Sequence, residues 1–236
     1  MKPFELSEFG RDLNNRFPSL DDLVRVFSDC PRLEQFGVCR AWIAEGIPSA
    51  FSENPLLFEV IREFIGKNLD VHPRDITLVG SARTGFSLSP FKLGKSFDEN
   101  SDLDLAIVSA EYFDLCEAEF IRFKQDYENG VVVPSGPRQR LLWEEIIEDL
   151  ERQRIRRGFV DIFKVPTKLQ YPLACSAVDT CWRVKEKLNA TGFGPYIKEC
   201  SIRVFRDNFS LIRQNTINLE RALRNKEAKN SSTVNS

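Results

Sequence analysis

The sequence predicts an α+β fold in which a small mixed β-sheet is flanked by helices from both chain ends. The first observation is size: 236 residues, 42% of them apolar, can bury a sizeable core in one domain or in two unequal ones. The second is that apolar residues recur at helical spacing in residues 1–70 and 167–226. The third is that residues 71–166 contain short apolar runs with alternating polar positions, which indicate strands.

Residues 1–70 are expected to form helices that pack on the core. Ser19 begins a capping-box pattern that opens the first helix. A second helix is predicted over 32–45, because Gly46 is a good helix stop. Asn54 followed by Pro55 is a good cap and first position for a third helix.

Residues 71–166 are expected to form the core that carries the chemistry. Strands are predicted over 76–80, 103–108 and 158–165, and helices over 110–127 and 138–154. Residues 167–226 predict two further helices, over 172–188 and 200–225. The last segment, 227–236, is polar and rich in Asn and Ser, so we expect a disordered tail.

Several classes of protein are excluded by composition. No apolar run is long enough to span a bilayer, and the first residues lack an apolar signal region, so we expect a cytoplasmic protein without membrane contact. The six cysteines form no C-x-x-C pair and indicate reduced core residues rather than disulfides or a zinc site. The single histidine, His72, excludes mechanisms that need two histidines, which leaves carboxylates, hydroxyls and cations for chemistry.

Charge is distributed unevenly although the formal net charge is only −2. Residues 98–119 hold eight Asp or Glu and no Lys or Arg, whereas residues 182–229 hold eleven Lys or Arg against five Asp or Glu. A concentrated negative field favours metal cations, and a basic counterpart favours phosphate. The alternative is that two solvated helix faces of opposite sign dock together.

Asp102 and Asp104 are the first candidate functional residues. On a strand, residues two apart point the same way, so both carboxylates project from one face about 7 Å apart along the backbone. Two like charges held together are unfavourable unless a cation lies between them, and a divalent metal suits this pair. The pattern also fits an exposed strand edge with two solvated aspartates.

Gly80 and Ser81 end the preceding predicted strand and begin a run of small polar residues. Glycine lets the backbone approach an anion closely, and the Ser81 and Thr84 hydroxyls and the Arg83 guanidinium are donors for phosphate oxygens. Alone, such a run is more often a simple turn. A phosphate-binding turn beside a metal-binding pair would form a site for a nucleoside triphosphate.

This arrangement resembles the nucleotidyltransferase superfamily, the DNA polymerase β-like group. The group's signature is a strand ending in Gly-Ser, then an Asp-x-Asp strand, then a third carboxylate on a later strand. Gly80-Ser81 and Asp102-x-Asp104 match the first two elements, and Asp161 is the best match to the third. Asp179 competes with Asp161 but falls in a predicted helix. The resemblance implies a divergent, bacterial-type member, and the gap between Gly-Ser and the aspartates is longer than is usual in the group.

The resemblance implies a metal-dependent enzyme that moves a nucleoside monophosphate from an NTP to an acceptor hydroxyl. It implies that Asp102, Asp104 and Asp161 bind two Mg²⁺ or Mn²⁺ ions and that Ser81 holds the triphosphate. The extra residues 86–97 form either a substrate-facing loop supplying Lys92 or Lys95 or a longer surface hairpin.

The resemblance also implies that a carboxyl-terminal helical domain closes one side of the nucleotide cleft and supplies cations. On the helix predicted over 200–225, Arg203 and Arg206 would share a face, one turn apart. Lys185 and Lys187 are further candidates. Each of the four also fits a surface charge that balances the acidic segment.

The acceptor stays open at this point. It is a second nucleotide, as in signal-nucleotide synthases of bacterial antiphage defence, an RNA 3′ end, a protein side chain, as in antitoxin-type enzymes, or a small molecule. An alternative is a catalytically inactive member that binds nucleotide or a partner protein. A third hypothesis is a helical interaction protein in which the motif is accidental.

Overall fold

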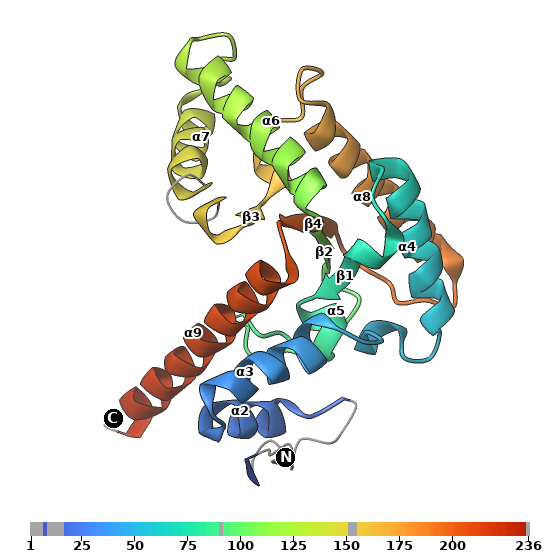
Figure 1. The fold of residues 1–236 in the computed structure, drawn as a ribbon, viewed down its shortest axis with the longest axis vertical. Coiled ribbons are helices and arrows are strands. Elements are labelled where there is room, and N and C mark those ends of the chain that lie inside the picture. Colours follow the sequence, from blue (N-terminus) through green and yellow to red (C-terminus); the bar gives the residue numbers. More distant parts are fainter. Residues whose placement is uncertain (1–6, 9–16, 90–91, 151–154, 235–236) are drawn as a thin grey trace, which may run out of the picture.

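A computed structural model of the chain describes residues 7–8, 17–89, 92–150 and 155–234. These residues form eight α-helices and a four-stranded mixed sheet, with helices at both ends, which confirms the α+β prediction (Figure 1). The helices are α2 (Leu20–Asp29), α3 (Arg32–Val38), α4 (Pro55–Leu69), α5 (Ser81–Thr84), α6 (Ala110–Glu128), α7 (Pro137–Asp149), α8 (Pro172–Thr191) and α9 (Asn208–Val234). The strands are β1 (Ile76–Val79), β2 (Leu103–Val108), β3 (Phe159–Val160) and β4 (Cys200–Phe205). Among the described helices, none is both long enough and apolar enough to cross a membrane.

The strands lie in the order β1-β2-β4-β3, so the last strand in the chain occupies an inner position. β2 pairs antiparallel with β1 and parallel with β4, and β4 pairs antiparallel with β3. The parallel register places Asp104 opposite Ser201 and Ala106 opposite Arg203. A residue and its opposite partner project from the same face of a sheet, so the β4 side chains at 201 and 203 share a face with Asp104.

Alternation along the strands separates two hydrophobic clusters, one on each face of the sheet. Leu103, Leu105 and Ile107 pack in the larger cluster, to which α4, α6, α7 and α8 contribute. Ala106 packs in the second cluster with residues of α2, of α9 and of the π-helical segment Cys39–Ala44. Figure 1 shows α4, α6, α7 and α8 around one side of the sheet and α2, α3 and α9 on the other. Asp104 therefore lies on the face that α9 covers.

The amino-terminal helices follow the prediction closely. The Ser19 hydroxyl accepts a hydrogen bond from the Asp22 amide and caps α2. The helix predicted over 32–45 is present as α3 followed by the π-helical segment Cys39–Ala44. Pro55 begins α4, but the Asn54 side chain does not cap it. Its amide nitrogen donates instead to the carbonyl of Phe193 at 3.0 Å.

Two predictions about the carboxyl-terminal half are wrong. The helix predicted over 200–225 begins only at Asn208, and residues 200–205 form the strand β4. The physical reason is a two-residue period, in which Ile202 and Val204 are buried while Ser201 and Arg203 are half-buried. At the other end, α9 extends to Val234 through most of the expected tail 227–236, whose last two residues lie outside the described residues.

The strand predicted over 158–165 is also shorter than expected. Only Phe159 and Val160 pair with β4, and a 3₁₀ turn over Ile162–Lys164 follows. The helix predicted over 138–154 ends as α7 at Asp149, and residues 151–154 lie outside the described residues. All six cysteines are free thiols, and five are buried, as the composition predicts. Burial raises the pKa of Cys39 to about 11 and that of Cys116 to about 12.

Candidate functional site

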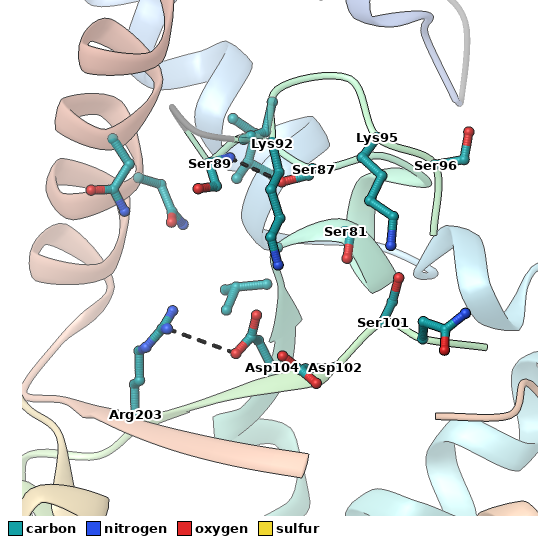
Figure 2. A pocket seen from close by; sticks show the side chains of 17 residues that line it. Ser81, Ser87, Ser89, Lys92, Lys95, Ser96, Ser101, Asp102, Asp104 and Arg203 are labelled. Carbon is teal, nitrogen blue, oxygen red and sulfur yellow. Dashed lines mark hydrogen bonds and ion pairs between the residues drawn. The ribbon is translucent and has the colours of Figure 1, made fainter. Parts of the chain in front are cut away.

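Asp102 and Asp104 line a polar pocket at the end of the sheet, on the face that α9 covers. Its volume is about 400 Å³. The pocket lies where β1 ends and β2 begins, and the loop between α5 and β2 arches over it (Figure 2). Its lining residues are Ile43, Val79, Gly80, Ser81, Ser87, Leu88, Ser89, Lys92, Lys95, Ser96, Asn100, Ser101, Asp102, Asp104, Arg203, Asn215 and Asn218. Carboxylates and cations therefore face one another across a single hydrophilic space.

The two aspartates differ in their surroundings. Asp104 is half-buried, and its Oδ1 accepts a hydrogen bond of 2.7 Å from the Ser201 hydroxyl. The same oxygen lies 3.7 Å from the Arg203 guanidinium. Asp102, just before β2, is exposed at the pocket mouth and makes no ion pair with another described residue. Asp104 is thus held in position by β4, and Asp102 remains open to solvent or ligand.

Gly80 connects β1 to the short helix α5 and allows the close approach of Asp104. Its φ of +67° and ψ of −153° lie in a region that almost only glycine adopts. A Cβ atom at this position would lie 2.9 Å from Oδ2 of Asp104. The first residue of α5, Ser81, then lines the pocket (Figure 2). Gly80 and Ser81 therefore lie beside the aspartates, as predicted.

The loop over 86–97 is a short hairpin that also lines the pocket. The Ser87 amide donates to the Lys95 carbonyl at 2.7 Å, and the Gly94 amide donates to the Ser87 carbonyl at 2.9 Å. Figure 2 shows the Lys92 and Lys95 side chains extending from this loop toward the strand that carries the aspartates. The hairpin prediction is confirmed, and the segment also lines the pocket, while a substrate-facing role for its lysines stays a prediction. The residues at positions 90–91 lie outside the described residues.

A third carboxylate, Asp98, stabilises the base of this loop. It accepts hydrogen bonds from the Ser101 hydroxyl at 2.9 Å and from the backbone N–H of Asn100 at 3.0 Å. Lys95 forms an ion pair with it at 3.2 Å. The hydrogen bond from Ser101 and then that from Lys95 lower the pKa of Asp98 below its ordinary value. Lys95 and Ser101 are thereby held together at the pocket wall.

Arg83 and Thr84 do not reach the pocket, contrary to the prediction. Arg83 is buried, and its guanidinium donates to the carbonyls of Ile47 at 2.6 Å and Ala41 at 3.2 Å. The Thr84 hydroxyl donates to the carbonyl of Phe86 at 2.6 Å. The reason is that α5 makes one helical turn, which directs the side chains at 83 and 84 into the protein.

Of the four predicted cations, only Arg203 lines the pocket. Lys185 pairs with Glu199 at 3.1 Å, and the Lys187 ammonium lies 5.4 Å from the ring centroid of Phe64. Arg206 packs over the Phe113 ring and pairs with Glu117 at 3.4 Å. Arg203 and Arg206 do not share a face, because residues 200–205 are a strand rather than a helix.

Asp161 is not brought together with Asp102 and Asp104. β4 lies between β2 and β3, so a strand separates Asp161 from the pair. One strand spacing is about 4.8 Å, which places the two backbones about 10 Å apart. The register that pairs Val160 with Val204 continues toward Arg203, and Asp161 lines a neighbouring pocket with that arginine. Asp179, the competitor, lies on α8 and pairs with Arg183 at 2.9 Å.

The donor set suits one divalent cation better than a closed metal site. In the described part of the chain, no three His, Cys, Asp or Glu side chains gather closely enough to hold a metal ion. Mg²⁺ commonly takes one or two carboxylates from the protein, and waters and substrate phosphates complete its shell. Asp102 and Asp104 fit that role, with Ser81 and the two loop lysines placed for phosphates. The three-carboxylate, two-ion arrangement is not assembled here.

The sequence patterns did not identify Asn215 and Asn218, which line the pocket, or Ser201, which donates a hydrogen bond to Asp104. Ser201 was missed because its segment was assigned to a helix; the alternation Cys200 to Phe205 was the signal that could have identified it. Asn215 and Asn218 lie on α9, three residues apart, so both reach the same side of that helix. No local signal distinguishes them from solvated helix residues.

Neither a scan against models of protein families nor searches of curated proteins and of solved structures found a match for this chain.

Proposed function

We propose that the protein is a metal-dependent nucleotidyltransferase of the DNA polymerase β-like kind, which transfers a nucleoside monophosphate from an NTP to an acceptor hydroxyl. One observation carries the proposal. Asp102 and Asp104 share a polar pocket with the turn residue Ser81 and with three cations, Lys92, Lys95 and Arg203. This is the combination that a triphosphate with a bound Mg²⁺ requires: carboxylates for the cation, and cations and hydroxyls for phosphate oxygens.

In the proposed reaction, the acceptor oxygen bonds to the α-phosphorus while the bond from this phosphorus to the bridging oxygen breaks, and pyrophosphate leaves. Asp102 and Asp104 would hold a divalent cation, which would neutralise charge at the phosphates and lower the pKa of the acceptor hydroxyl. Asp102 takes the hydroxyl proton, since Asp104 is already engaged by Ser201 and Arg203. Lys92, Lys95 and Arg203 hold the phosphates and stabilise the charge on the leaving pyrophosphate.

The test combines nucleotide-dependent stabilisation with product release. Mg²⁺ with an NTP at about 100 times its Kd should raise the Tm by about 5–10 °C, because a ligand at that excess adds about 2.7 kcal/mol. Each labelled NTP, alone and with cellular RNA or lysate, should release pyrophosphate. Asp102→Asn should abolish the Tm response and lower turnover by at least about 100-fold. Asp179→Asn, on α8 away from the pocket, is the matched control and should behave like the wild type.

A second candidate, a nucleotide-binding member without turnover, is favoured by one specific contact. Arg203 lies on β4, the strand between the aspartate pair and Asp161, and its guanidinium forms an ion pair with Asp104. A cation at this position substitutes for part of the charge that a second metal ion would supply. The same experiment separates the candidates: a Tm response without pyrophosphate release supports binding alone, and no response to any nucleotide contradicts both.

A further inference from the structure

A second pocket adjoins the candidate nucleotide pocket and shares one wall with it. Its volume is about 420 Å³. It is lined by Val79, Asp149, Arg157, Phe159, Asp161, Lys164, Arg203, Phe205, Gln214, Asn215, Asn218 and Arg221. The shared wall consists of Val79, Arg203, Asn215 and Asn218. Groups bound in the two pockets would therefore meet at Arg203 and the two asparagines.

The second pocket is positively charged. Four cations line it, Arg157, Lys164, Arg203 and Arg221, against the carboxylates Asp149 and Asp161, each of which is engaged in an interaction of its own. Arg203 is paired with Asp104. The other three cations form no ion pair with another residue of the described part of the chain. Like charges gathered without partners are unfavourable, so this pocket favours an anionic occupant.

The shared wall holds a side-chain amide that has no hydrogen-bond partner among the described residues. The side-chain nitrogen of Asn215 is buried and finds no hydrogen-bond acceptor among the described residues. Buried donors are nearly always satisfied, and an orphan donor at a pocket wall points to a ligand acceptor. One helical turn away, the side-chain oxygen of Asn218 accepts a hydrogen bond of 2.9 Å from the side-chain nitrogen of Gln214. The side-chain nitrogen of Asn218 is then left to donate. Both asparagines are thus suited to phosphate or sugar oxygens at the junction.

We infer that the second pocket binds the phosphate of the acceptor, and that the acceptor is a nucleotide, either free or at the end of an RNA strand. A nucleotide carries a phosphate and ribose hydroxyls on one small unit. With its phosphate among Arg157, Lys164 and Arg221, its hydroxyl can lie at the shared wall facing the α-phosphate of the NTP. This inference rests on the proposed function, because it identifies the acceptor of that reaction.

Binding measurements test the inference separately from turnover. The full chain is saturated with Mg²⁺ and a non-hydrolysable NTP and then titrated, by calorimetry, with a nucleoside 5′-monophosphate, the corresponding nucleoside, and a six-nucleotide RNA with a free 3′-hydroxyl. We expect the monophosphate or the RNA to bind at least about 10-fold more tightly than the nucleoside, the order of one charge-assisted hydrogen bond. Tighter binding of the monophosphate would identify a free nucleotide as the acceptor, and tighter binding of the RNA would identify an RNA end.

Variants locate the site. Lys164→Ala with Arg221→Ala should weaken binding of the phosphorylated probe by about 10- to 100-fold and leave the NTP Kd within about twofold. Both side chains are exposed, so folding should be retained. Arg213→Ala, exposed on α9 and lining neither pocket, is the matched control and should change nothing. The single variant Arg221→Lys keeps the charge, so it should bind the phosphorylated probe with an affinity close to that of the wild type.

Three results would overturn the inference. If the monophosphate and the nucleoside bind with the same Kd while the NTP binds normally, the second pocket does not recognise phosphate, although the proposed function stands. If label from the NTP passes to protein in lysate and the double variant transfers it equally well, the acceptor is a protein group. If the wild type binds no NTP, the proposed function fails and the inference fails with it.

Discussion

The Arg203 guanidinium lies 3.7 Å from the Asp104 carboxylate, across two adjacent parallel strands whose residues are far apart in the chain. The arginine comes from β4, which enters the sheet between β2 and β3. It therefore separates Asp104 from Asp161 and joins the walls of two pockets at the same time. Arg203 thus contributes one cation to both pockets and neutralises part of the charge of Asp104.

Replacing Arg203 by alanine should weaken Mg²⁺–NTP binding by about 10-fold or more, because a charge-assisted hydrogen bond to phosphate contributes about 1.5–3 kcal/mol. Arg206→Ala is the matched control. Arg206 contacts Glu117, Asp114 and the Phe113 ring rather than the pocket, so NTP affinity should not change. Calorimetric Kd values for both variants check the prediction, and equal losses would contradict the strand assignment of residues 200–205.

Gly80→Ala should lower both stability and nucleotide affinity. The backbone conformation at Gly80 costs a non-glycine residue about 1–3 kcal/mol, and the added Cβ would meet Oδ2 of Asp104 at 2.9 Å. Gly130→Ala supplies the comparison, since Gly130 also has positive φ, of +70°, but nothing lies within 4 Å of its Cβ position. Urea unfolding should show a loss for both variants. Only Gly80→Ala should also weaken NTP binding, and an NTP Kd unchanged in that variant would argue against the role of Asp104.

Arg83→Met should destabilise the protein by about 2–4 kcal/mol, because the carbonyls of Ile47 and Ala41 would lose buried charge-assisted hydrogen bonds. The NTP Kd of the remaining folded protein should stay within about twofold of the wild type, since Arg83 does not line the pocket. Chemical denaturation and binding at low temperature measure the two effects. A stable variant with greatly weakened NTP binding would instead support the phosphate-binding role expected from the sequence.

The Asp98 carboxyl should titrate below its ordinary pKa, because Ser101 and Lys95 stabilise its charged form. A depressed folded-state pKa contributes stability that is present above the unfolded pKa of about 3.9 and is lost as pH falls through the folded value. The hydrogen bonds and ion pair of Asp98 should therefore persist as the pH falls through the ordinary pKa of an aspartate and be lost only at lower pH. An NMR titration of the Asp98 carboxyl carbon checks the direction of this shift.

Ser101→Ala should raise the Asp98 midpoint toward its ordinary value, since the Ser101 hydrogen bond is the largest cause of the shift. Ser96→Ala, which alters another hydroxyl of the same pocket, should leave the midpoint unchanged. An unchanged Asp98 midpoint in the Ser101→Ala variant would mean that the Ser101 hydroxyl does not stabilise the charged form of Asp98.

Local patterns were enough to predict most of the helices and the two strands that carry the Gly-Ser and Asp-x-Asp motifs. Caps such as Ser19, the start of α4 at Pro55 and the alternation Leu103 to Val108 act over a few residues, so they can be recognised without the rest of the chain. The strand β4 was missed, because its alternation spans only six residues and was interpreted as the start of the helix that follows it. Only its pairing with β2 and β3 fixes it as a strand.

By itself, the sequence determined that Asp102 and Asp104 flank the start of a buried strand and that Gly80 and Ser81 form a tight turn before it. These features depend on backbone conformation and on the two-residue period of a strand. Only the tertiary structure decided which groups surround them. Ser201 reaches Asp104 from 97 positions away, and Arg83 turns into the core. The reason is that strand order and side-chain burial arise from contacts between distant segments, which no local pattern encodes.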